Sequence, residues 1–277
     1  MRTIKQPGPT TSHNHVVCLS QYEHVTLSLS AGCALLAGLV NALGDKAACG
    51  AHVEVRNAAV SALDYVGPAP APDETHAAWY SETRTPSMPG VIEDARLTYG
   101  FREGEPFFHC HGSWRGRDGV SVTGHLLPDT AILAEDTDVE VWLFSDARFD
   151  VTPCAVTNFS LFTPRALHPS VDGDAALVKL YPNCEIGEEL AAVSAFLGWE
   201  GADVKGIGSI IGAVFDDGRV LESYATEFYF TDGRVSADAP ADLHLTIVGI
   251  DGAAMSGRLK PSANATFITC EVILLRR

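Results

Sequence analysis

The sequence lacks the features of a membrane-spanning or secreted disulfide-bonded protein. Its seven cysteines contain no CxxC pair, and an odd number of unpaired cysteines is typical of reduced thiols in a cytoplasmic protein. The longest apolar stretch, residues 33–43, is too short to cross a bilayer. The polar start of the chain does not have the pattern of a signal peptide. We therefore expect a cytoplasmic protein without membrane contact.

Basic residues are also scarce. The chain has 19 Lys and Arg against 35 Asp and Glu, a formal net charge of -16. An acidic protein repels phosphate backbones, so binding to nucleic acid would need a local basic patch. The densest basic group is only Arg115 and Arg117, and nucleic acid is therefore not an expected partner. By contrast, 46% of the 277 residues are hydrophobic, which is enough for one large domain or two ordinary ones.

Two segments of the sequence repeat one pattern. Residues 108–128 and 242–261 align on an Asp-Gly pair, which is typical of the turn of a β-hairpin. The matched residues are His111 with His244, Gly124 with Gly257, Leu126 with Leu259, and Pro128 with Pro261. The alignment indicates that one structural unit occurs twice in the chain.

The match continues upstream of the two hairpins. Residues 31–43 and 186–197 have apolar residues at helical spacing, and an apolar strand follows each. Each half therefore predicts strand, helix, several strands and a hairpin. This is an α+β fold of two tandem domains, each a mainly antiparallel sheet with a covering helix.

We expect the first domain to span residues 1–165 and the second residues 166–277, with the joint within 162–174. The first half is longer because of residues 67–90, which include five prolines. Such a segment predicts a loop. It is either an ordinary surface loop or a lid over a site in the first half.

Three histidines lie close together in the first hairpin. His109 and His111 are two residues apart on a predicted strand, so both face one side and Cys110 faces the other. If Arg117–Gly119 is a three-residue loop, His125 lies directly opposite His111 on the same side. A two-residue loop would turn His125 away. In the first register three imidazoles can share one divalent metal ion, most plausibly zinc.

Other candidate residues lie outside this hairpin. Glu54 is a charge inside an apolar strand, where it could act as acid/base or as a fourth ligand. Arg56 lies two residues on and could hold an anionic substrate. The alternative, which we favour from the sequence, is that both belong to an ordinary polar face on an edge strand. In the second hairpin Arg258 stands where the first has His125; it cannot bind a metal, and could hold a carboxylate instead.

The hairpin of residues 109–128 resembles the plant-and-prokaryote-conserved (PPC) domain, whose prokaryotic members share H-x-H, a turn with Asp-Gly, and Gly-His-Leu. The second half resembles a diverged copy. The PPC fold is similar to that of α-acetolactate decarboxylase, a zinc lyase whose metal is held by an H-x-H and a later histidine. The resemblance implies a metal at His109, His111 and His125, and trimeric packing with sites near subunit interfaces.

Plant members carry an R-G-R-P motif that binds the minor groove of DNA. Here the R-G-R of residues 115–117 is followed by Asp118 inside the predicted turn. The DNA-binding motif of the plant members is thus not matched. From the predicted metal ligands and the resemblance, we expect a metal-dependent lyase or hydrolase that acts on a small anionic metabolite. The alternatives are a DNA-binding or regulatory protein, and a non-catalytic binder that uses the metal to hold a metabolite.

Overall fold

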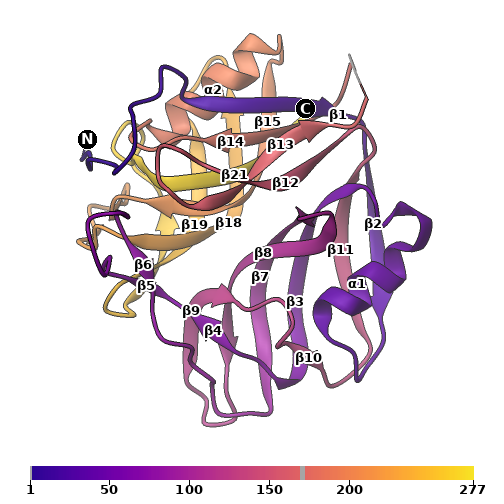
Figure 1. Cartoon of the computed structure of the whole chain (residues 1–277). Coiled ribbons are helices and arrows are strands. Elements are labelled where there is room, and N and C mark those ends of the chain that lie inside the picture. Colours follow the sequence, from indigo (N-terminus) through magenta and orange to yellow (C-terminus); the bar gives the residue numbers. More distant parts are fainter. Residues whose placement is uncertain (1, 169–171) are drawn as a thin grey trace.

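The computed structural model describes residues 2–168 and 172–277, and this part of the chain is built mainly of antiparallel β-strands. Its two α-helices are short: α1 (Leu35–Leu43) and α2 (Ile186–Phe196). The fold is therefore mainly β rather than the α+β class expected from two covering helices. Figure 1 shows one sheet in the lower half with α1 beside it, and the other in the upper half beneath α2. No helix of the described part is long and apolar enough to span a membrane.

The larger sheet is formed by the first half of the chain. Its main path runs β2 (Tyr22–Leu29), β11 (Thr137–Phe144), β3 (Gly50–Ala62), β7 (Gly90–Arg102), β8 (Glu105–Arg115), β9 (Ser121–Leu126) and β4 (Tyr65–Val66). Three further strands attach to it: β10 (Ile132–Leu133), β12 (Ala147–Pro153) and β13 (Ser160–Ala166). The single parallel pairing within this sheet joins β12 to β7 over two residues of each.

The second sheet has seven strands. They are β1 (His15–Ser20), β14 (Ala175–Leu180), β21 (Thr266–Arg276), β15 (Gly201–Ile210), β18 (Thr226–Ser236), β19 (Asp242–Gly249) and β20 (Ala254–Arg258). Two short ribbons lie apart: β5 (Pro68–Ala69) with β6 (Trp79–Tyr80), and β16 (Ala213–Val214) with β17 (Val220–Leu221).

Six strands of each sheet follow the same order. The larger sheet runs β2-β11-β3-β7-β8-β9 and the other runs β14-β21-β15-β18-β19-β20. In both, the first and sixth strands in chain order are neighbours at one end, and a helix connects the first strand to the second. The sheets do not divide the chain at residues 165 and 166, because β1 pairs with β14 in the second sheet. Part of the expected joint, residues 169–171, lies outside the described residues.

Each of the two helices packs against its own sheet. Leu35 and Leu39 of α1 are fully buried against the larger sheet, while Leu190 and Val193 of α2 are buried against the other. The Glu185 side chain begins α2 by accepting a hydrogen bond from the Glu188 backbone N–H at 2.7 Å. Each helix thus closes an apolar core against its own sheet.

Where the two sheets face each other, an apolar cluster that includes Phe162 and Ile273 lies beside a group of polar side chains. Successive residues of a strand point to opposite sides. On β8, Phe108 and Cys110 therefore lie in the apolar core beneath α1, whereas His109 and His111 bond groups of the second sheet. The alternation places the functional side chains of both sheets in one polar layer.

Candidate metal centre

The turn of the first hairpin fixes the register of its two strands. Gly116 N–H donates to the Val120 carbonyl at 3.2 Å, and Gly119 adopts a φ of +78°. The loop is therefore the three residues Arg117–Gly119, with glycine in the left-handed position that this loop type requires. As a result His111 lies directly opposite His125 on β9. The register predicted from the sequence is confirmed.

The three imidazoles lie close enough to share one ion. Ring centroids are 4.7 Å apart for His109 and His111, 4.7 Å for His109 and His125, and 5.4 Å for His111 and His125. One nitrogen from each ring lies within 4.8 Å of the other two. With metal–nitrogen bonds of about 2.0–2.1 Å, an ion at the centre of such a triangle is within reach of all three after small ring adjustments.

The second sheet holds the far side of two of these rings. His109 Nδ1 donates to the Glu271 carboxylate of β21, at 2.9 and 3.0 Å from its two oxygens. His111 Nδ1 donates to the Phe228 carbonyl of β18 at 2.9 Å. A carbonyl can only accept, so the proton of a neutral His111 is on Nδ1 and its Nε2 presents a lone pair. Carboxylate and carbonyl partners of this kind orient histidine ligands in metal sites.

Burial favours the neutral form of two of the rings. It lowers the pKa of His111 and of His125 well below the usual 6.5, and the nearby His109 lowers both further. These two histidines are therefore neutral near pH 7, which is the form that binds metal.

Two of the ring nitrogens approach each other closely. His109 Nε2 lies 3.1 Å from His111 Nε2. Because His111 Nε2 presents a lone pair, a neutral His109 bonded to Glu271 through Nδ1 would point a second lone pair at it. Only a proton or a metal ion makes this contact favourable. His125 Nδ1 is also buried without a hydrogen-bond partner. The donor set therefore fits a divalent metal such as zinc.

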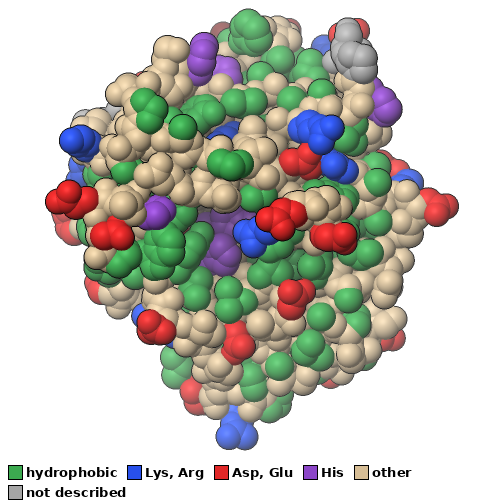
Figure 2. All heavy atoms as spheres, viewed as in Figure 1, with side chains coloured by type: hydrophobic (Ala, Val, Ile, Leu, Met, Phe, Trp, Pro, Cys, Tyr) green, Lys and Arg blue, Asp and Glu red, His purple; other side chains and the backbone are tan. Residues whose placement is uncertain are grey.

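A cavity of about 70 Å³ opens beside the three rings. Figure 2 shows histidine atoms deep in a hollow near the centre of this face, framed by hydrophobic side chains. The walls include Trp79, Tyr80 and Phe159, and the Tyr80 ring lies 5.3 Å from that of His125. Trp79 and Tyr80 belong to the proline-rich segment 67–90, so this segment forms a wall of the cavity rather than a distant surface loop.

A second hollow adjoins the first and shares His109, His125 and Tyr80 with it. Arg102, at the end of β7, lines this hollow with its guanidinium 3.9 Å from the centre of the Phe107 ring. Arg102 is exposed, and it forms no ion pair with any of the described residues. It is therefore the cation best placed to meet an anion at the three histidines.

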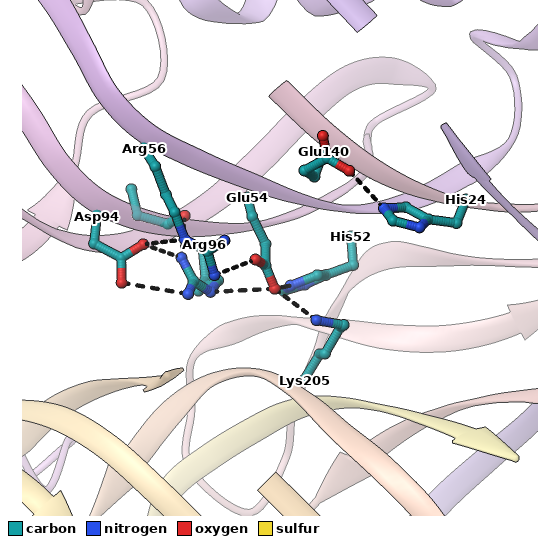
Figure 3. A network of polar contacts seen from close by, with 9 residues as sticks. His24, His52, Glu54, Arg56, Asp94, Arg96, Glu140 and Lys205 are labelled. Carbon is teal, nitrogen blue, oxygen red and sulfur yellow. Dashed lines mark hydrogen bonds and ion pairs between the residues drawn. The ribbon is translucent and has the colours of Figure 1, made fainter. Parts of the chain in front are cut away.

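Glu54 lies elsewhere in the polar layer, in a network of charges (Figure 3). Its carboxylate contacts Lys205 Nζ at 2.7 Å and Arg56 at 2.7 Å, and Arg96 at 3.4 Å. Burial raises its pKa, but His52 and the cationic neighbours lower it by more, so that the net pKa of Glu54 is below its ordinary value. Glu54 lines neither hollow at the histidines. An ionised carboxylate with three cationic partners is suited to joining the sheets rather than to transferring protons.

The two arginines predicted to bind substrate are also not brought to the histidines. Arg56 pairs with Glu54 and with Asp94, and about half of its side chain is exposed. Arg258 lies opposite His244 on the second hairpin, where it pairs with Asp242 at 2.7 Å. Neither lines the two hollows. The second hairpin keeps the register of the first with an ion pair in place of the imidazoles.

The sequence reasoning missed Glu271, Glu227 and Arg102. Glu227 and Glu271 are both carboxylates within otherwise apolar strands, a signal equal to the one that drew attention to Glu54. Their place at the site depends on the packing of β18 and β21 against β8, more than a hundred residues away along the chain. Local patterns do not contain this information.

The solved structures that the chain resembles are smaller proteins. A metal-containing protein from Archaeoglobus fulgidus is 20% identical with a TM-score of 0.43, and covers 53% of this chain and 97% of its own. A PPC protein from Pyrococcus horikoshii is 14% identical with a TM-score of 0.39, covering 56% and 96%. A protein from Ralstonia eutropha whose name suggests DNA binding is 16% identical with a TM-score of 0.38, covering 51% and 94%. No family model and no curated protein matches the chain. At these levels a function must be argued from the residues of the site.

Proposed function

We propose that the protein binds one divalent metal ion, zinc, through His109, His111 and His125, and that it catalyses a lyase or hydrolase reaction on a small anionic metabolite. The observation that carries the proposal is the close approach of the Nε2 atoms of His109 and His111, with both Nδ1 atoms bonded to acceptors. Three neutral protein ligands would leave a coordination position open to water or substrate.

A bound zinc ion would supply Lewis-acid polarisation of a substrate oxygen. Around it, Glu271 and the Phe228 carbonyl orient two of the ligands, and Arg102 attracts and orients an anionic group at the adjoining hollow. This assigns to Arg102 the role that the sequence suggested for Arg56 and Arg258. The aromatic walls of Trp79, Tyr80 and Phe159 restrict water around the reacting groups.

We further infer that the chain is a tandem pair of PPC-like domains in which the first copy keeps the metal ligands. Two observations support it: the shared strand order of the two sheets, and the pairing of His111 with His125 where the second hairpin pairs His244 with Arg258. The same proposal includes a relation in fold to α-acetolactate decarboxylase. It also includes a trimer of the chain, which would form a ring of six such domains.

Elemental analysis of the purified protein tests the metal site. We expect close to one equivalent of a divalent metal in the wild type, and a loss of at least tenfold in metal affinity in His109→Ala and His125→Ala, because each removes one of three ligands. His244→Ala is the matched control: His244 occupies the equivalent position of the second hairpin and bonds Asp242, so its loss should leave the metal content unchanged. A wild type without stoichiometric metal, when purified or after incubation with zinc, would overturn the proposal.

A further inference from the structure

Glu227 on β18 is buried beside the three histidines without a partner. Its side chain lines the cavity that they line, and the residue is 7% exposed. Its Oε2 makes no hydrogen bond, and it forms no ion pair within the described part of the chain. Most buried polar groups are hydrogen-bonded, since an unsatisfied one destabilises the fold. An apolar residue would therefore serve the packing at this position better.

The neighbouring polar groups of the cavity are already engaged. The Thr226 hydroxyl donates to the Ile210 carbonyl at 2.6 Å, and the Ser209 hydroxyl accepts from the Ile268 N–H at 3.0 Å. The remaining lining is largely apolar or aromatic, including Trp79 and Phe267. The Glu227 carboxyl is thus a free polar group within an apolar chamber.

We propose that the Glu227 carboxyl group donates a hydrogen bond to an acceptor oxygen of a ligand whose apolar body lies between Trp79, Tyr80 and Phe159. The ligand is a small acid or ketone with an aromatic or branched apolar group. This inference deepens the proposed function, because the other end of that ligand would lie at the metal and Arg102. Glu227 is then the substrate-binding group that distinguishes such a ligand from a purely polar anion.

The protonation state of Glu227 agrees with a donor. Without a bound metal ion, burial raises the pKa of this carboxyl to about 8, so near neutral pH the metal-free protein carries the proton that a donor needs. The titratable groups that line the same cavity are Tyr80, His109, His111 and His125, and none of them forms a hydrogen bond with Glu227. If the acceptor oxygen belongs to a carboxylate of the ligand, it would therefore face the neutral carboxylic acid of Glu227 and would not be repelled by a second negative charge.

Paired probes test the donor directly. The ketone 4-fluoroacetophenone has an acceptor oxygen, whereas 1-fluoro-4-isopropylbenzene has nearly the same shape without one. We would measure the affinity of the full chain for both by fluorine NMR, before and after zinc loading, in wild type, Glu227→Gln and Glu227→Met. The ratio of ketone to hydrocarbon affinity should fall about tenfold in Glu227→Met, because the donor is lost. It should be retained in Glu227→Gln, whose amide N–H still donates.

The design separates this inference from the metal site. Glu185→Gln is the control: this buried carboxylate bonds the start of α2, away from the cavity, and its loss should leave the ratio unchanged. The metal-free measurements report on Glu227 whatever the zinc content proves to be. An equal ratio in wild type and Glu227→Met, or no binding of either probe, would overturn the role of Glu227 while leaving the metal site standing. If the protein bound no zinc but the affinity ratio still depended on Glu227, the metal site would be overturned and the role of Glu227 would stand.

Discussion

Glu227 is a single residue whose burial has a consequence for stability as well as for binding. Its pKa is about 8 in the folded chain against an ordinary 4.5, so between these values the folded state holds a proton that the unfolded state has released. The contribution of Glu227 to stability should therefore fall as pH rises from 4.5 to 8, by at most about 1.4 kcal/mol per pH unit.

Glu227→Gln removes this dependence. We expect the variant to unfold at a higher temperature than the wild type at pH 9 and to lose most of that advantage at pH 5. Thermal unfolding of chelator-treated protein at both values measures it. A difference that stays constant with pH would show that Glu227 is ionised in the fold.

At the scale of elements, the length of one loop decides whether the histidines meet. Deleting Arg117 leaves a two-residue loop, which would move the register of β9 by one residue and turn His125 to the opposite face. We expect at least a tenfold loss of metal affinity, measured by competition with a chelator.

The second hairpin offers the matched control for this deletion. Gly249 N–H donates to the Ala253 carbonyl at 3.1 Å, so Ile250–Gly252 forms an equivalent three-residue loop. Deleting Ile250 should disturb that hairpin comparably while metal binding persists. Equal loss of metal in both deletions would mean that general unfolding, not register, was responsible.

Much at this scale was predictable from the sequence. The Asp118-Gly119 turn, the helices and the paired hairpins are local patterns, and the structure confirms the facing of His111 and His125. The role of Glu54 was not predictable, because Lys205, 151 residues away along the chain, neutralises it. The pairing of β1 with β14 likewise depends on a sheet edge assembled from distant segments. These features are determined by contacts between distant strands, which the periodicity of a single strand does not reveal.

For the whole molecule, the polar layer between the sheets predicts sensitivity to acid. His52 in this layer is fully buried, and neither ring nitrogen has a hydrogen-bond partner. Burial lowers its pKa to about 4 in spite of the neighbouring Glu54. The unfolded chain protonates this histidine near 6.5, so its contribution to stability is lost as pH falls from 6.5 to 4, by at most about 1.4 kcal/mol per pH unit.

His52→Leu should lose less stability than the wild type between pH 7 and pH 5. Urea unfolding at both values measures the difference, and His13→Leu, at an exposed histidine, is the control. Identical losses in wild type and His52→Leu would place the acid sensitivity at other groups, such as His111 and His125.

The hydrogen bonds from His109 to Glu271 and from His111 to Phe228 have a reciprocal effect. Since the second half of the chain orients the ligands of the first, whatever strengthens the docking of the halves must strengthen ion capture, and ion capture must strengthen docking by the same free energy. A bound ion would therefore stabilise the contact between the two sheets, although all three of its ligands lie in the first half of the chain. The second half of the chain, which has no such histidine cluster among its described residues, would then still take part in every binding event, because it holds two of the ligands in place.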